Sequence, residues 1–325
     1  MQAVDIQALR AFRLGQEQDL ESATGCTVVL CPKGALCGAD VRGGSPGTRD
    51  TDALSPLCNR RAVHAVVLAG GSSFGLDAAG GVMRFCEEQG IGRDVGVAKV
   101  PNVCAAILFD LKCGRSDVRP DAEMGYRACQ NAMLKQKFQR GNFGAGTGAA
   151  VGKARGMAHA MKGGIGCVAL RHGDLIVGAV VAVNCVGDVV SDGKIIAGTR
   201  DGQNGFADSE EVLLSEYQEN KDFFSGNTVL GCLITNAVLD KPGAVKLASQ
   251  GQNGIARVVR PAHSTFDGDT VFALCSGEVC SSQDAVGILS AKAMELAILD
   301  AVQCADGLHG LPGLRDLRLR ASGAL

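Results

Sequence analysis

Residues 225–236 read "SGNTVLGCLITN". The run 229–234 is continuous and apolar, as in a strand that is covered on both faces. Gly226, Asn227 and Thr228 stand immediately before it, and the charged stretch "DSEEVLLSEYQENKDFF" precedes them. The pattern predicts a polar loop that leads a single threonine to the start of a core strand.

A threonine in this place has two interpretations. Taken alone, an Asn-Thr pair favours an ordinary polar strand start. The chemical alternative is a nucleophile, because the α-amino group of an N-terminal threonine can act as the base that its hydroxyl needs. That amine has a reference pKa of about 7.7–8.0, close to neutral pH. It would exist only if the Thr228 hydroxyl attacked the Asn227 carbonyl and the chain were cut between the two residues.

Composition excludes several classes of protein. The chain has 325 residues, 46% of them hydrophobic, and a formal net charge of −2. It shows no basic stripe with interleaved aromatic residues, so we expect no nucleic-acid partner. The most apolar run, 175–183, is too short to cross a bilayer, and residues 1–16 lack the layout of a signal peptide. We therefore expect a cytoplasmic protein without a membrane segment.

Cysteine is abundant but does not indicate a site. The 14 cysteines are scattered, with no CxxC pair and no histidine at ligand spacing. This pattern favours reduced, mostly buried thiols over a metal centre or a disulfide framework.

Apolar runs alternate with helical patterns along the chain, which predicts a single α/β domain without a linker. We predict strands at 27–30, 65–70, 165–170, 175–184, 229–235 and 270–277. We predict helices at 77–89, 121–138, 242–259 and 283–304, the last of them largely buried. The 45 glycines gather in the loops between these elements.

Two glycine-rich motifs suggest other chemistries. "GAGTGAAVG" (144–152) lacks the preceding strand that a dinucleotide fingerprint requires. "GSSFG" (71–75) lies between a predicted strand and a predicted helix, the context of an esterase nucleophile at Ser73 with His263 or His309 as partner. The sequence favours the simpler interpretation, in which Ser72 or Ser73 caps the helix.

Seven blocks, in order between residues 13 and 304, together resemble the self-processing aminopeptidases of the DmpA type. This is the S58 peptidase family, which includes β-aminopeptidases and nylon-oligomer hydrolases. The blocks are "GADVRGGSPGTRDTDAL", "VHAVVLAGGSSFGLDAAGGVMRF", "RPDAEMGYRAC", "GAGTGAAVGKARG", "VVAVNCVGDVV", "GNTVLGCLITNAVL" and "STFDGDTVFALCSGE". The resemblance implies a four-layer αββα sandwich of the N-terminal-nucleophile type, shared with ornithine acetyltransferase. It also implies self-cleavage into 1–227 and 228–325.

The resemblance assigns roles to particular residues. Thr228 would be the nucleophile, Asn184 a donor to the oxyanion, and Asp267 and Asp269 of "FDGDT" the acidic groups beside the nucleophile. Lys153 would lie near them. No metal and no organic cofactor are implied.

The substrate side is less closely defined. Glu123 and Tyr126 are candidates for its lining, and "GGSSFG", with Ser72 and Ser73, is a candidate for its wall. The expected substrates are short peptides or small amides with a free amino end, and the expected assembly is a homo-tetramer.

Three other functions stay open at this point. An acyltransferase of the ornithine acetyltransferase type would use the same threonine and pass its acyl group to an amine. A binding protein could keep the fold and never process itself. An esterase with Ser73 as nucleophile is the third.

Overall fold

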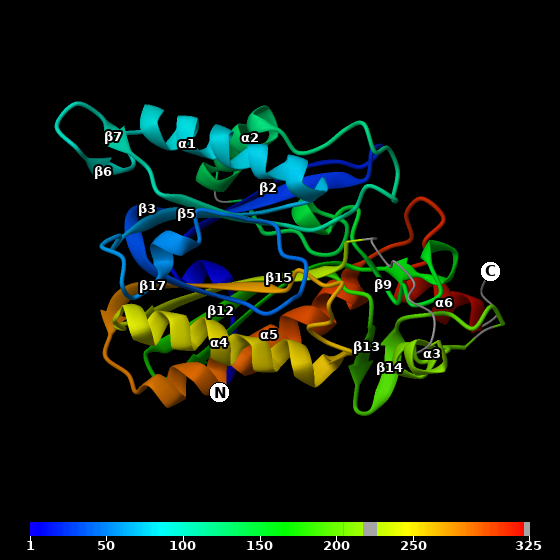
Figure 1. Ribbon diagram of the computed structural model, residues 1–325. Helices are drawn as coiled ribbons and strands as arrows, with labels where there is room; N and C mark the ends of the chain where they lie inside the picture. The colour runs from blue at the N-terminus through cyan, green and yellow to red at the C-terminus, as the bar shows by residue number, and fades with distance from the viewer. Residues whose placement is uncertain (135, 204, 217–225, 322–325) are drawn as a thin grey trace.

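The computed structural model describes residues 1–134, 136–203, 205–216 and 226–321 (Figure 1). Its main feature is a ten-stranded sheet in the spatial order β1-β11-β12-β15-β17-β3-β5-β8-β4, with β2 also paired to β3. The strands are β1 (Gln2–Val4), β2 (Arg13–Asp19), β3 (Thr24–Val41), β4 (Thr48–Arg49), β5 (Val63–Ala69), β8 (Val103–Ile107), β11 (Gly164–His172), β12 (Leu175–Asn184), β15 (Thr228–Ala237) and β17 (Thr270–Val279).

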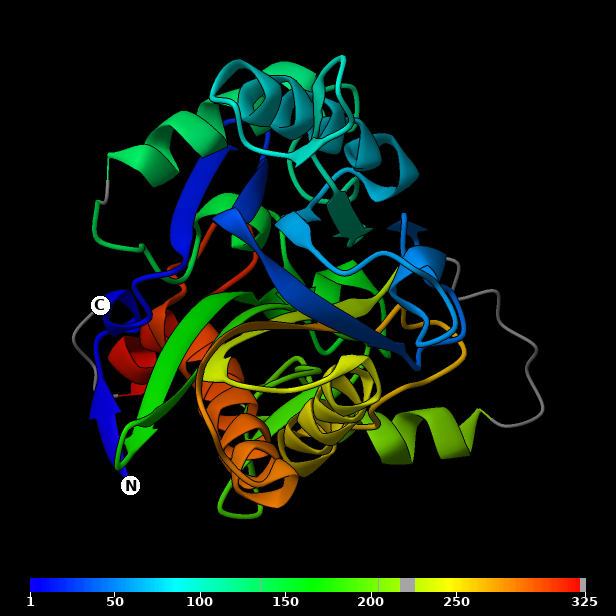
Figure 2. The ribbon, with the colours of Figure 1, turned by 90° about the vertical axis from the view of Figure 1, so that its left-hand side faces the viewer.

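The long strand β3 connects two layers. Its first half pairs with β2 and β5, whereas residues 36–41 pair with β17. The sheet is thereby divided into two layers that face each other (Figure 2). We call β1, β11, β12, β15 and β17 the first sheet, and β2, β5, β8 and β4 the second sheet.

Helices cover the outer faces of both sheets. In Figures 1 and 2, α1 and α2 lie on the second sheet, and α4 and α5 lie on the first. The helices of the described chain are α1 (Ala78–Glu88), α2 (Ala122–Met133), α3 (Ser209–Ser215), α4 (Lys241–Val258), α5 (Gln283–Cys304) and α6 (Leu314–Ala321). Short strands are β6 (Arg93–Asp94), β7 (Lys99–Val100), β9 (Ala150–Val151), β10 (Met161–Lys162), β13 (Asp188–Ser191), β14 (Lys194–Ala197) and β16 (Val259–Arg260). Short 3-10 helices are η1 (Ile6–Ala8), η2 (Asp52–Leu54), η3 (Ser72–Asp77), η4 (Gly144–Gly146) and η5 (Met157–His159).

Strand β15 shows how the layers are packed. Val229 and Leu233 face the helices α4 and α5, and Leu230 and Cys232 face the second sheet. This alternation follows from the two-residue period of a strand. A third core fills the space between the second sheet and α1 and α2. The protein is therefore the four-layer αββα sandwich that the sequence predicts.

The long helices begin at capping side chains. The carboxylates of Asp121 and Asp240 accept hydrogen bonds from the third residue of α2 and α4, and Ser282 does the same for α5. Each satisfies a backbone N–H that has no partner within its helix. These caps explain why the starts of the helices predicted at 121, 242 and 283 agree with the structure to within one residue.

Some predicted boundaries are wrong. The helix predicted over 121–138 ends at Met133, because Phe138 packs against the core between the two sheets instead of continuing the helix. The strand predicted at 27–30 is the middle of β3, which has 18 residues. The charged stretch predicted as a loop contains α3, which Asp208 caps. Residues 217–224 of that stretch lie outside the described residues.

Candidate active site

Thr228 lies at the end of a central strand of the first sheet, on the face toward the second sheet. It is the first residue of β15 and is paired with Asn184, the last residue of β12. By the alternation of β15 and β12, both side chains belong to the set that faces the second sheet. Two ends of neighbouring antiparallel strands therefore place a hydroxyl and an amide side by side.

The peptide bond between Asn227 and Thr228 is enclosed by polar contacts. Thr228 is 3% exposed, and its hydroxyl donates a hydrogen bond to the Asn227 carbonyl oxygen. The backbone N–H of Gly268 donates to the same oxygen at 2.7 Å and approaches Thr228 Oγ1 at 3.3 Å. The N–H of Asn227 donates to the Phe266 carbonyl oxygen at 3.2 Å. A buried N–H directed at a carbonyl oxygen stabilises negative charge that forms there.

Asp269 joins this peptide to the loop that leads into β17. Its Oδ1 accepts a hydrogen bond from the N–H of Val229 at 2.6 Å. Its Oδ2 accepts from the N–H of His263 at 3.1 Å and lies 2.7 Å from His263 Nδ1. The carboxylate is 1% exposed, so it is fixed against the residue that follows Thr228.

Asp267 belongs to the same loop and is equally buried, but it binds different groups. Its Oδ1 accepts a hydrogen bond from the N–H of Val186 at 3.3 Å, and its Oδ2 accepts from the hydroxyl and the N–H of Ser264. Burial, with the negative charge of Asp269 as a second cause, raises the pKa of Asp267 to about 6. The charge of Asp269 is therefore close enough to raise the pKa of Asp267.

Lys153 binds Asn184, the residue that is paired with Thr228 across β12 and β15. Its Nζ donates to the Asn184 backbone oxygen at 2.7 Å and to Oδ1 at 3.0 Å. The lysine is 4% exposed, so it is a buried residue and not a surface lysine. Burial lowers its pKa to about 8, although the Cys185 thiol and the Asp267 carboxylate act in the opposite direction. A substantial fraction of Lys153 is therefore neutral near pH 8.

The amide of Asn184 does not touch the Asn227 carbonyl in the continuous chain. Its Nδ2 donates to the backbone oxygens of Phe109 at 3.0 Å and Gly226 at 3.2 Å, one peptide earlier than expected. Its Oδ1 accepts from the N–H of Ala150 at 2.9 Å. The donor to the Asn227 carbonyl is the Gly268 N–H, which the sequence does not single out because a backbone group carries no sequence signal.

A small cavity lies beside Asn184 and Lys153. Its volume is about 10 Å³, enough for roughly one water molecule. It is lined by Phe109, Asp110, Lys112, Cys113, Gly148, Ala150, Lys153, Met157 and Asn184. The Asn227 side chain is fully buried, and neither its oxygen nor its nitrogen has a hydrogen-bond partner among the described residues. The Asn227 side chain is therefore held by packing and not by hydrogen bonds of its own.

Both glycine-rich loops pack around one buried carboxylate. Asp110 accepts hydrogen bonds from the Gly71 N–H at 2.7 Å and from the Thr24 hydroxyl at 2.8 Å. A Cβ on Gly70 would meet its Oδ2 at 1.9 Å, and one on Gly148 would meet its Cβ at 2.6 Å. The glycines of "LAGGSSFG" and "GAGTGAAVG" thus permit close packing around Asp110, which itself lines the cavity.

The two serines of this loop do not act as helix caps. Ser72 and Ser73 are the first residues of η3, and neither η3 nor α1 has a capping hydrogen bond from a side chain. The capping prediction is therefore wrong, because the 3-10 turn η3 separates these hydroxyls from the start of α1. The Ser72 N–H donates to the Leu108 oxygen at 3.0 Å, so this residue belongs to the loop beside the cavity.

Glu123 and Tyr126 lie elsewhere. Both are on α2, where Glu123 pairs with Arg84 at 2.9 Å and the Tyr126 hydroxyl donates to Glu88 at 2.6 Å. Arg84 and Glu88 belong to α1, so these contacts join the two outer helices. We call Thr228, Asn184, Lys153, Asp267 and Asp269 the Thr228 cluster. The structure does not bring Glu123 or Tyr126 into contact with it.

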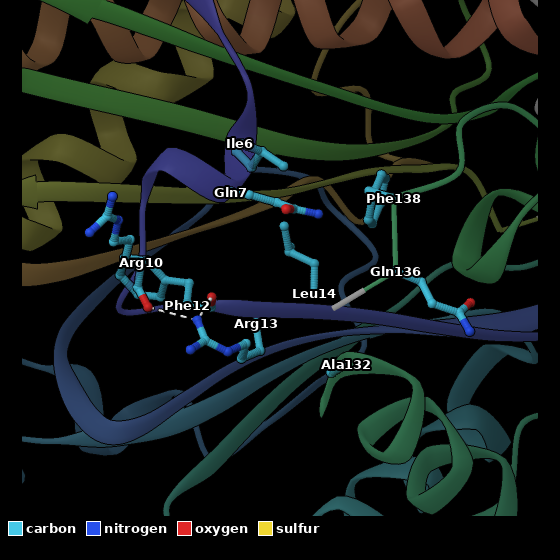
Figure 3. A pocket seen from close by; sticks show the side chains of 9 residues that line it. All are labelled: Ile6, Gln7, Arg10, Phe12, Arg13, Leu14, Ala132, Gln136 and Phe138. Carbon is cyan, nitrogen blue, oxygen red and sulfur yellow. Dashed lines mark hydrogen bonds between the residues drawn. The ribbon is translucent and has the colours of Figure 1, made fainter. Parts of the chain in front are cut away.

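A separate cavity of about 280 Å³ opens between η1, the start of β2 and the end of α2 (Figure 3). Its lining is mainly apolar, with Arg10 and Arg13 at its side. Arg13 Nη1 already donates to the backbone oxygens of Arg10 and Phe12, at 2.7 and 2.9 Å. The lining shares no residue with the Thr228 cluster, so this larger cavity does not define the candidate site.

Comparison with known proteins identifies the family of the chain. The model of peptidase family S58 matches residues 4–315. The chain belongs to peptidase family S58. An uncharacterized aminopeptidase of Mycobacterium leprae is 39% identical to this S58 chain over 316 residues, covering 89% of this chain and 85% of that protein. A 6-aminohexanoate-oligomer endohydrolase of Paenarthrobacter ureafaciens is 30% identical over 265 residues, covering 80% and 71%. Family membership indicates a hydrolase that acts on amide bonds.

Solved structures share the fold of this S58 chain. A Burkholderia sp. β-aminopeptidase has a TM-score of 0.68 at 18% identity, covering 96% of this chain and 92% of its own. The L-aminopeptidase D-Ala-esterase/amidase of Ochrobactrum anthropi, described as a variant of the Ntn hydrolase fold, has a TM-score of 0.66 at 16% identity, with the same coverage. These likenesses show that the αββα sandwich is the fold that these solved aminopeptidases share.

The described residues contain neither a candidate membrane span nor a candidate metal site. None of their helices is both long and apolar enough to span a membrane. Within 1–134, 136–203, 205–216 and 226–321, no group of three or more His, Cys, Asp or Glu side chains is arranged to bind a metal ion.

Proposed function

We propose that this S58 chain cuts itself before Thr228 and then hydrolyses amides with Thr228 as its N-terminal nucleophile. One observation carries the proposal: the Thr228 hydroxyl and the Gly268 N–H meet at the carbonyl of Asn227. A nucleophile and an oxyanion donor at one buried carbonyl are the two groups that acyl transfer requires.

Self-cleavage begins when Thr228 Oγ1 bonds to the carbonyl carbon of Asn227 and the C–N bond between the residues breaks. The hydroxyl proton passes through a base to the departing nitrogen, which becomes the α-amine of Thr228. Water then hydrolyses the ester, restoring the hydroxyl and leaving a carboxylate on Asn227. Lys153 is the base proposed for this step, because burial lowers its pKa to about 8 and its Nζ is held on Asn184, the residue paired with Thr228 in the sheet.

After cleavage the new amine takes over as the base, since its reference pKa is about 7.7–8.0. It accepts the hydroxyl proton as Thr228 attacks a substrate carbonyl and returns it to the leaving amine. Asp267 and Asp269 stabilise the ammonium form from the loop beside it. Asn184 supplies a second oxyanion donor, because its Nδ2 is released when the Gly226 carbonyl leaves. Water then resolves the acyl-enzyme.

The two fragments stay together as one α/β unit in this proposal. Strand β15 lies between β12 of the first fragment and β17 of its own fragment, in the middle of the first sheet. Its apolar side chains are buried on both faces. Cleavage at its first residue therefore opens the site without separating the layers. The substrates that fit so small a site are short peptides and small amides.

Variants at position 228 test the proposal. Wild-type protein should be found as fragments 1–227 and 228–325 and should hydrolyse alanine p-nitroanilide. Thr228→Ala should stay uncut and inactive, while the matched variant Thr228→Ser, which keeps a hydroxyl, should process and retain activity. Equal hydrolysis by Thr228→Ala and wild type would contradict the proposal. Efficient acetyl transfer from N-acetylornithine to glutamate would identify an acyltransferase instead.

A further inference from the structure

The backbone before the cleavage site passes very close to Phe109. Gly226 has a φ of +36°, and a Cβ built on it would lie 2.2 Å from Phe109 Cβ and 2.5 Å from its Cγ. Contacts this short are not tolerated, and φ values in this region disfavour residues other than glycine. The residue that precedes Asn227 therefore has no room for a side chain.

Phe109 cannot move aside to make that room. Its backbone oxygen accepts a hydrogen bond from Asn184 Nδ2 at 3.0 Å. On one side the Leu108 N–H donates to the Ala69 oxygen at 2.9 Å, and on the other Asp110 is held by Gly71 and Thr24. The atom closest to a Cβ built on Gly226 is the Phe109 Cβ. This atom is bonded directly to the backbone, so its position does not depend on the rotamer of the ring. The obstruction is therefore part of the loop itself.

The uncut chain shows how an acyl group lies in the site. If Thr228 acts as proposed above, a substrate carbonyl takes the place of the Asn227 carbonyl, and its acyl residue takes the place of Asn227. The nitrogen of that residue then lies where the Asn227 N–H donates to the Phe266 oxygen, at 3.2 Å. Any group attached to this nitrogen has to follow Gly226 past Phe109.

We propose that Phe109 selects substrates by what precedes their acyl residue, and this inference rests on the proposed function. A free amine at that position fits, since nothing then passes Phe109. A glycyl group or an unbranched methylene chain also fits, because neither carries a side chain at the point of contact. A residue with a Cβ, alanine or larger, is excluded. The substrate class is therefore aminoacyl amides and their N-glycyl or N-(ω-aminoalkanoyl) extensions.

Processed wild-type enzyme should show this order directly. The probes are the p-nitroanilides of Ala, Gly-Ala, 6-aminohexanoyl-Ala and Ala-Ala. We expect kcat/KM for the first three to agree within about tenfold, and the value for Ala-Ala to be at least about 100-fold lower, the discrimination expected when a rigid site rejects a misplaced group. Hydrolysis of Ala-Ala at the rate of Gly-Ala would overturn the inference and leave the proposed function intact. Hydrolysis of none of the four would overturn both.

Self-cleavage supplies a second readout that needs no substrate. Gly226→Ala should slow processing at least about 100-fold, because its methyl group meets Phe109. Adding Phe109→Gly, which removes the Cβ, should restore processing, whereas the matched variant Phe109→Ala keeps the Cβ and should not. Thermal unfolding of each uncut protein shows whether it is folded. Equal processing of folded Gly226→Ala and wild type would contradict the obstruction.

Discussion

The backbone N–H of Gly268 lies 2.7 Å from the carbonyl oxygen of Asn227 and 3.3 Å from Thr228 Oγ1. Gly268 stands between Asp267 and Asp269, and both carboxylates are buried and held by backbone N–H groups. The loop is thereby fixed, with its N–H directed at the peptide bond before Thr228. Because a donor that is already in place needs no reorganisation when charge develops, this arrangement favours attack on that carbonyl.

Gly268→Ala should slow self-cleavage by about 10²–10³-fold, the loss typical of a disturbed oxyanion donor. The added Cβ would lie 2.8 Å from both Thr228 Oγ1 and the Ser45 backbone oxygen, so the loop must shift. Processing is followed by gel electrophoresis after rapid purification. Gly80→Ala is the control, since its Cβ would have no neighbour closer than 3.9 Å. Unchanged processing in Gly268→Ala would remove Gly268 from the account.

The rate of self-cleavage should rise with pH up to about 8. The general base has to be neutral, and burial lowers the pKa of Lys153 to about 8, so the neutral fraction increases about tenfold per pH unit below that value. Lys153→Met should lose about 10²–10⁴-fold in rate and this pH dependence. Processing rates measured from pH 6 to 9 test both statements. A pH-independent wild-type rate would argue against Lys153 as the base.

Asp269→Asn separates the charge of this residue from its hydrogen bond. The amide oxygen can still accept from the Val229 N–H, so the fold should survive, but the negative charge beside the Thr228 amine is lost. We expect normal far-ultraviolet circular dichroism and a fall in kcat of about 10²-fold, within the range of general acid–base contributions. A variant with wild-type kcat would show that the charge of Asp269 has no part in the reaction.

Asp110→Ala should destabilise the protein by about 1–3 kcal/mol, because it leaves the buried Gly71 N–H without its acceptor. Asp117→Ala is the control: that carboxylate pairs with Arg115 on the surface, where loss of an ion pair has little effect on stability. Urea unfolding of both variants in the uncut Thr228→Ala background gives the comparison. Equal stability of the two variants would mean that Asp110 does not hold the glycine-rich loops.

The sequence predicts the layers because its apolar runs indicate which segments are buried. Strand β12 and helix α5 have the predicted bounds, since continuous apolar residues and a capping Ser282 define them locally. The end of α2 is predicted too late. Phe138 fits the helical pattern, but in the folded chain it packs against the core between the two sheets. Local patterns therefore give the elements, and long-range packing decides where some of them end.

The site divides in the same way. The resemblance to the S58 family indicates the five residues that the structure brings together, namely Thr228, Asn184, Lys153, Asp267 and Asp269. It does not assign Gly268 or Phe109 a part, since one acts through a backbone N–H and the other through its packing on Gly226. The sequence suggests His263 only as a partner of Ser73. Its position six residues before Asp269 is the signal that could have linked the two.

The central claim is that the bond between Asn227 and Thr228 is cut by Thr228 itself. The most direct test is the intact mass of the purified protein, with N-terminal sequencing of the smaller fragment. We expect a fragment that begins Thr228-Val229-Leu230 in the wild type, and a single uncut chain in Thr228→Ala. A wild-type chain that stays whole, or a fragment that begins at another residue, would contradict it.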